Sequence, residues 1–201
     1  MQSSRLEAFS DGVLAIIITI MVLELHVPHG STLRDLWDTT GTSVLTYLLS
    51  FVYVGIYWNN HHHLFQISDR VDGAVLWANL HLLFWLSLYP FTTAWMDGTD
   101  LARTPTAVYG FNLLAAAVAY FLLVQAIKRL PGAGDKVRAA IGNDVKGKVS
   151  PLLYALGIGL TFVQPWLAVI PYVVVALMWL VPDRRVERWL EGERQARDQG
   201  S

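Results

Sequence analysis

Long apolar runs separated by short polar connections constrain this chain more than any other feature. Of its 201 residues, 54% are hydrophobic and only 15% are charged, and the charges gather in the connections. About 20 helical residues are needed to span the roughly 30 Å hydrocarbon core of a bilayer, and the runs meet or approach that length. The polar stretches are too short to form a packed core of their own. We therefore expect residues 1–201 to form one all-α, multi-pass membrane domain.

The last apolar run, residues 149–182, decides the number of spans. It is too long for one ordinary span, and Pro165 and Pro171 interrupt it. The positive-inside rule places basic short connections in the cytoplasm, and of the 15 Lys and Arg residues only Arg34 and Arg103 lie in the alternate connections. The C-terminal arginines lie on the same side of the membrane as the other basic residues only if the last run forms two short helices that turn near Gln164. The prediction is six transmembrane helices with both termini cytoplasmic, at about 4–27, 41–65, 74–95, 105–128, 149–164 and 166–182.

Two connections and the C-terminal tail have recognisable sequence patterns. Residues 28–42, with Leu33 and Trp37 on one side, fit either a short interfacial helix or a capped loop turn. The tail 183–201 carries apolar residues around Trp189 among arginines, which is typical of an amphipathic surface helix. The basic connections, 128–148 and this tail, either orient the protein or contact anionic lipid headgroups.

Composition and motifs exclude several classes of protein. The net charge of −1 gives no reason to expect a nucleic-acid partner, and the absence of cysteine excludes disulfides and thiolate metal sites. The chain has no nucleophile with an adjacent base, no phosphate-cradling glycine loop and no paired carboxylates, so we predict neither enzyme activity nor a cofactor. The first apolar run lacks a cleavage site and is expected to be a retained helix rather than a signal peptide.

A polar cluster that includes Arg5, Ser10 and Asp11 opens the first apolar helix. A carboxylate at the mouth of a membrane helix costs several kcal/mol unless it meets water, a partner or a cation, so Asp11 indicates a functional site. One hypothesis is that Asp11 carboxylates from several chains concentrate cations at the entrance to a pore.

The apolar residues after this cluster recur on one face of the helix. They are Ile16, Ile20, Leu23 and Val27, with Thr19 beside them. Simple packing against other helices would explain such a face. If several copies surround an axis instead, rings of these side chains would form constrictions that gate by dewetting. Because the chain contains no Thr-Val-Gly-Tyr-Gly loop, potassium preference would have to come from a narrow side-chain constriction, with the Thr19 hydroxyl replacing part of the hydration shell.

A second polar cluster, Trp58 to His63, lies near the end of the second span, at the depth of Asp11. Its consecutive histidines, His61, His62 and His63, point about 100° apart around a helix. They lack the i, i+4 spacing of a zinc site, so we predict no tightly bound metal. Trp58 and His62 share a face and are expected to hydrogen-bond Ser10 or Asp11 of the same or a neighbouring chain. Alternatively, the histidines simply lie in the wet membrane interface.

Other polar residues in the spans are weaker candidates for a permeation path. They are Glu24, His26, Asn79, His81, Asn112 and Gln125. For each of them we expect hydrogen bonding between helices or a position at the membrane interface.

These residues together resemble the bacterial members of the transmembrane protein 175 potassium channel family. The matching pattern is Arg5-x-x-x-Phe9-Ser10-Asp11 at the start of helix one, an isoleucine-rich helix, and then Trp58 with the histidines that end helix two. The pattern is specific in combination with six spans, and the resemblance covers nearly the whole chain.

The resemblance implies a potassium channel fold without the Thr-Val-Gly-Tyr-Gly filter, in a bacterial plasma membrane. It implies a homotetramer in which helix one lines the pore, potassium permeates ahead of sodium, and the hydrophobic constriction falls on Ile16, followed by Thr19, Ile20 and Leu23. The motif residues would then form a network that ties helices and subunits together, which we favour over a cation-attracting role for Asp11. Potassium in transit, membrane lipid and further copies of the chain are the expected partners.

Two other functions stay open at this point. A secondary transporter would couple protons to a small solute through Asp11 and the histidines, although the chain lacks the second repeat that such folds use. A non-conducting membrane scaffold would use the polar clusters only for assembly.

Overall fold

The computed structural model describes residues 3–68, 71–141 and 144–180, and all the regular secondary structure in them is helical. The helices are α1 (Ser3–Leu23), α2 (Leu33–Ile67), α3 (Gly73–Ser87), α4 (Tyr89–Asp97), α5 (Arg103–Lys128), α6 (Ala133–Ile141), α7 (Val145–Leu160) and α8 (Pro165–Leu180). Residue 70 and the predicted surface helix around Trp189 lie outside the described residues.

Four helical segments are long and apolar enough to cross a membrane. They are Ser3–Leu23, Leu33–Ile67, Gly73–Asp97 and Arg103–Lys128. The third segment joins α3 and α4, which meet at Leu88. Pro90 follows at the start of α4, and because proline has no N–H to donate, it interrupts the helical ladder at this place.

The last apolar run divides into two helices at Pro165, as predicted, but the expectation that Pro171 also interrupts it was wrong, because Pro171 lies inside α8. α7 ends at Leu160, and Pro165 is the first residue of α8, which is a favourable position for proline because the first N–H of a helix has no partner within the helix. The two helices pack side by side, but each has 16 residues, or about 24 Å at 1.5 Å per residue. This is shorter than an ordinary span, so the total of six spans stays a prediction.

The segment 28–42 differs from both expected structures. From Leu33 onward it forms the beginning of the 35-residue α2, rather than a separate interfacial helix or a loop turn. Thr32 caps this helix, since its Oγ1 accepts a hydrogen bond from the Asp35 N–H at 3.2 Å while the Asp35 carboxylate accepts one from the Thr32 N–H at 2.9 Å. This reciprocal capping box starts the helix ahead of the apolar run, because it satisfies two N–H groups that would otherwise lack partners.

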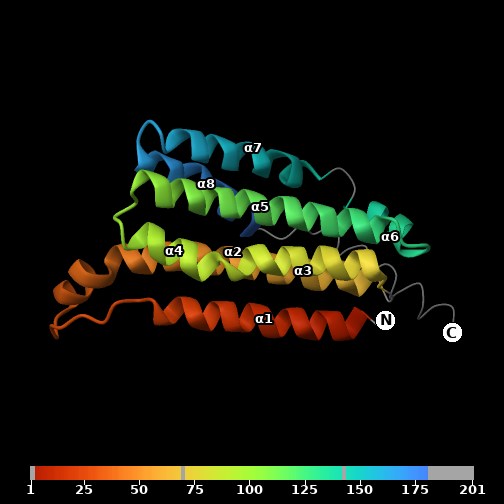
Figure 1. Cartoon of the computed structure of the whole chain (residues 1–201), viewed down its shortest axis with the longest axis horizontal. Helices are drawn as coiled ribbons and strands as arrows, with labels where there is room; N and C mark the ends of the chain where they lie inside the picture. The colour runs from red at the N-terminus through yellow and green to blue at the C-terminus, as the bar shows by residue number, and fades with distance from the viewer. Residues whose placement is uncertain (1–2, 69–70, 142–143, 181–201) are drawn as a thin grey trace.

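The helices form an elongated bundle with α1 at one edge and α7 at the opposite edge (Figure 1). The beginning of α1, the end of α5 and the whole of α6 lie at the same end of the bundle (Figure 1). These elements hold much of the basic charge of the described chain, whereas Arg34 and Arg103 begin helices at the other end. The segregation of charge therefore exists in the fold and not only in the order of the sequence.

The centre of the bundle is built from tyrosines and hydroxyl groups as well as aliphatic side chains. Tyr53, Tyr89, Tyr109 and Tyr172 are fully buried. Tyr53 Oη donates to the Tyr172 carbonyl oxygen at 2.6 Å, and Ser50 Oγ lies 3.0 Å from Tyr109 Oη. Such hydrogen bonds join helices in a lipid environment, where apolar packing alone does not favour one neighbour over another.

Two glycines allow the ring of Tyr172 to lie between α5 and α7. A Cβ atom at Gly110 would collide with the Tyr172 hydroxyl, and one at Gly157 would collide with its ring. Gly157→Ala is therefore expected to lower the free energy of unfolding by about 1–3 kcal/mol through overpacking. Thermal unfolding in detergent, followed by circular dichroism, measures the loss.

Gly159→Ala is the matched control, because a Cβ atom at Gly159 meets nothing within 4 Å. Alanine favours a helix over glycine by about 0.5–1 kcal/mol, so this control should be neutral or slightly stabilising. Equal destabilisation by the two substitutions would show that close packing on Tyr172 is not the cause.

Candidate functional site: helix α1 and its anchors

Helix α1 has one face buried against the rest of the chain and another face without a partner in the described structure. The buried residues are Leu6, Ser10, Leu14, Ile17 and Met21. The predicted pore residues lie on the other side: the exposed fraction is 58% for Ile16, 43% for Ile20 and 80% for Leu23. An exposed apolar stripe is ordinary on a lipid-facing helix, but it also suits association with further copies of the chain.

Thr19 is the polar member of this exposed face. Its Oγ1 donates to the Ile16 carbonyl oxygen at 2.9 Å. Since the hydroxyl proton is used within the helix, the oxygen lone pairs remain for an outside group such as a cation.

A buried chain of hydrogen bonds fixes α1 to α3 and α2. Ser10 and Asn79 are fully buried, and His61 is nearly so. Asn79 Nδ2 donates to Ser10 Oγ at 2.9 Å, Ser10 Oγ donates to the Leu6 carbonyl oxygen at 2.9 Å, and His61 Nε2 lies 2.8 Å from Asn79 Oδ1. Because Asn79 can accept at Oδ1, the geometry assigns the ring proton of His61 to Nε2.

A second set of contacts joins α1 to α2 closer to the surface. Trp58 Nε1 donates to Asp11 Oδ1 at 3.1 Å, which is the hydrogen bond expected for this pair. His62 bonds Glu7 rather than Ser10 or Asp11, with Nδ1 2.6 Å from Glu7 Oε1. The reason is that residues 7 and 11 are one turn apart on α1, and Trp58 and His62 are one turn apart on the antiparallel α2, so the two pairs align side by side.

The structure separates the predicted motif residues into two groups. Ser10, Asp11, Trp58, His61 and His62 meet at the junction of α1, α2 and α3. Arg5 and Phe9 are exposed instead, and Arg5 forms no ion pair with any described residue. These two side chains therefore lie at the surface of the described chain rather than inside the junction.

The histidines do not converge, as helical geometry predicts. His61 faces Asn79 on α3, His62 faces Glu7 on α1, and His63 Nδ1 is buried without a hydrogen-bond partner among the described residues. Across residues 3–68, 71–141 and 144–180, no group of three or more histidine or acidic side chains is arranged to hold a metal ion.

Sequence reasoning missed one member of this junction, Glu7. Asn79 was expected to hydrogen-bond between helices or to lie at the membrane interface, and it does bond between helices, since it connects Ser10 on α1 to His61 on α2. Glu7 was not singled out, although its i, i+4 spacing from Asp11 was a usable signal. The partner of Asn79 could not be read from sequence, because it depends on how α3 packs against α1.

Comparison with known proteins decides the family. A potassium channel from Chryseobacterium sp. is 52% identical to the chain over 191 residues, which cover 95% of this chain and 99% of that protein. The chain belongs to the TMEM175 family. The family model described as "Endosomal/lysosomal potassium channel TMEM175" matches residues 5–90, which include all but the first two residues of α1 and the whole junction.

Other TMEM175 relatives extend the match over most of the chain. A potassium channel from Streptomyces collinus is 32% identical, over 89% of this chain and 91% of that protein. The crystal structure of a lysosomal potassium-selective channel TMEM175 homolog from Chamaesiphon minutus superposes with a TM-score of 0.72 at 32% identity, covering 88% of this chain and 95% of that one. With four helical segments able to span a bilayer, the TMEM175 chain is an integral membrane protein.

Proposed function

We propose that this protein is a potassium-permeable cation channel of the bacterial plasma membrane. Four subunits surround a central pore lined by α1, six helices of each subunit span the membrane, and both termini are cytoplasmic. The proposal is supported by TMEM175 membership and by bacterial relatives that are named potassium channels.

The single observation that carries the pore assignment is the pair of opposite faces on α1. One face is fixed by the Ser10–Asn79–His61 chain, while Ile16, Thr19 and Leu23 are turned away from the subunit. A pore-lining helix needs this combination, because its outward side chains must keep one position while ions pass. Ile16 forms the narrowest apolar ring, and Thr19 offers oxygen lone pairs one turn further along.

The junction of α1, α2 and α3 serves as the support of this pore rather than as its filter. Asp11 is already a hydrogen-bond acceptor for Trp58, so its carboxylate is directed toward α2 and not along the exposed stripe. Exposed Arg5 and Phe9 contact the neighbouring subunit in this arrangement.

Potassium flux into liposomes that contain the purified full-length protein tests the proposed function. We expect potassium to enter faster than sodium under equal gradients. For each ion, the rate of entry should rise in proportion to the gradient of that ion, with no second solute required. Flux that saturates with a small solute and requires a pH gradient would instead support a proton-coupled transporter. Absence of cation flux from a folded tetramer would support a scaffold.

A further inference from the structure

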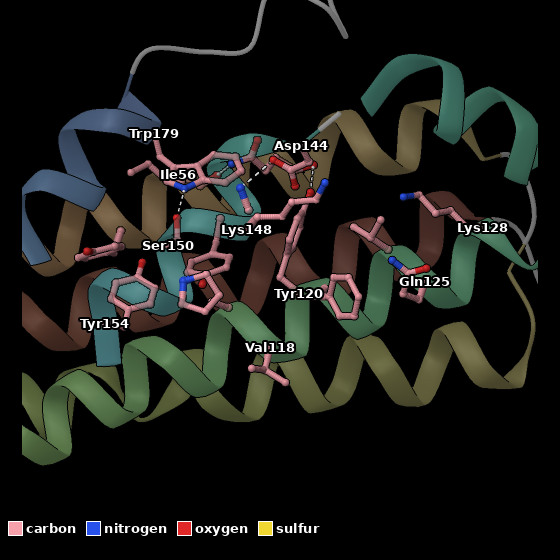
Figure 2. A pocket seen from close by; sticks show the side chains of 18 residues that line it. Ile56, Val118, Tyr120, Gln125, Lys128, Asp144, Lys148, Ser150, Tyr154 and Trp179 are labelled. Atoms are coloured by element: carbon pink, nitrogen blue, oxygen red, sulfur yellow. Dashed lines mark hydrogen bonds between the residues drawn. The ribbon is translucent and has the colours of Figure 1, made fainter. Parts of the chain in front are cut away.

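A cavity of about 550 Å³ lies away from α1, between α2, α5, α7 and α8. Its size is typical of sites for small organic ligands, which range from about 300 to 1,000 Å³. Figure 2 shows Gln125 and Lys128 on one side of this cavity and Tyr154 on the other. It is thus separate from the proposed pore, which lies at the opposite edge of the bundle (Figure 1).

The depth of the cavity corresponds to one leaflet of a bilayer. Its wall on α5 extends from Ala117 to Lys128, the last residue of that helix. These eleven steps span about 16 Å at 1.5 Å per residue, and half of the hydrocarbon core is about 15 Å. A molecule that enters beside Lys128 can therefore reach as deep as a single acyl chain does in the surrounding membrane.

The interior of the cavity offers mainly apolar surface, and several of its polar groups form hydrogen bonds within the protein. Ser150 Oγ accepts a hydrogen bond from Trp179 Nε1 at 2.9 Å and donates to the Lys146 carbonyl oxygen at 2.8 Å. Tyr53 Oη donates to a backbone carbonyl, and Asn60 Nδ2 donates to the Ile56 carbonyl oxygen. These hydrogen bonds use part of the polar capacity of the wall, and the aromatic and aliphatic side chains that make up most of it favour hydrocarbon.

The entrance of the cavity is polar and carries more positive than negative charge. It contains Lys128, Lys148, Gln125 and one acid, Asp144. The Asp144 carboxylate caps α7 by accepting a hydrogen bond from the Gly147 N–H at 2.7 Å. This bond fixes one of its oxygens at the first turn of α7. Lysines at the headgroup level attract anionic lipids, and long lysine side chains extend from apolar walls toward the interface.

We propose that this cavity binds an anionic phospholipid of the cytoplasmic leaflet. The phosphate contacts Lys128 and Lys148, and one acyl chain inserts between α2, α5 and α7 toward Tyr154. The match of depth, apolar interior and basic entrance favours a lipid over a water-soluble phosphate compound, which would leave the interior empty. The inference requires the membrane location and the proposed orientation, with the end of α5 at the cytoplasmic face, but not ion conduction, so lipid binding can be tested independently of channel activity.

Native mass spectrometry of the full-length protein in detergent provides the test, with palmitoyl-oleoyl phosphatidylglycerol as the probe and the matching phosphatidylcholine as comparator. We expect phosphatidylglycerol to bind more tightly. Because a lysine near the membrane surface contributes about 1 kcal/mol, Lys128→Gln should weaken binding about fivefold, and adding Lys148→Gln should weaken it about thirtyfold. Arg129→Gln is the matched control, since Arg129 is the exposed neighbour of Lys128 and does not line the cavity.

A second pair of variants tests the acyl chain. Ala117→Leu narrows the cavity and should reduce binding of both lipids, while Ala115→Leu, on the same helix but outside the cavity, should not. Equal affinity for the two lipids, equal effects of Lys128→Gln and Arg129→Gln, displacement by inorganic phosphate, or no effect of Ala117→Leu would each overturn the proposal. So would a tetramer structure in which residues 181–201 or a neighbouring subunit occupies the cavity.

Discussion

Replacing Ile16 with asparagine is expected to raise potassium flux about tenfold, which corresponds to a permeation barrier lowered by about 1.4 kcal/mol. Ile16 is 58% exposed on the face of α1 that the rest of the subunit leaves uncovered. In the proposed tetramer, four such side chains form an apolar ring that excludes water, and an amide in each position would hydrate it. Liposome flux with equal amounts of reconstituted protein measures the effect.

Two further substitutions make this test specific to the constriction. Ile16→Leu keeps the ring apolar and should leave the flux close to that of the parent. Val22→Asn places the same amide at another exposed position of α1, about a third of a turn away from the proposed pore face, and should have little effect. If a well-folded Ile16→Asn protein shows the same flux as the parent, Ile16 does not line the pore constriction.

Asn79→Leu is expected to cause the largest loss of stability among changes at the junction, about 1–3 kcal/mol. The substitution removes both hydrogen bonds of Asn79 and leaves buried His61 Nε2 without its acceptor. At about 2–4 °C per kcal/mol for a chain of this size, the midpoint of thermal unfolding in detergent should fall measurably. The same change removes a hydrogen bond between α1 and α3, so the proposed tetramer should also dissociate more readily in size-exclusion chromatography.

Two companion variants test whether the loss of stability comes from leaving the His61 imidazole without a hydrogen-bond partner. His61→Phe combined with Asn79→Leu removes the orphaned imidazole, and removal of both partners of a buried hydrogen bond can be nearly neutral. The double variant should therefore be more stable than Asn79→Leu alone. Gln66→Leu removes an exposed hydrogen bond to His62 and should change stability little. A double variant less stable than Asn79→Leu would show that the chain does not act as a hydrogen-bonded unit.

The positions of most helices could be predicted from the sequence, because apolar length and proline positions are local properties. The four long segments and the division of the last run near Gln164 are examples. The extension of α2 back to Leu33 was missed, since the polar residues there do not fit an apolar run, although the Thr32 and Asp35 capping pair was present in the sequence.

The candidate site was predictable only in part. The Trp58–Asp11 pair follows from two helices that run antiparallel with their polar clusters at equal depth. The choice of Glu7 for His62 depends on the rotation of α1 about its axis, and so does the outward position of Arg5 and Phe9. A sequence period defines which residues share a face, but it does not state which face is buried.

The sequence by itself determined that this chain is a helical membrane protein with a polar motif at the head of an isoleucine-rich helix. Hydropathy, charge asymmetry and residue spacing are sufficient for that, because the bilayer imposes its thickness on every span. Only the tertiary structure decided that Ser10 faces Asn79 while Ile16 faces away, and that a cavity with lysines at its entrance opens between α2, α5 and α7. These features arise from the packing of helices that are distant in the chain, which fixes their rotation and separation.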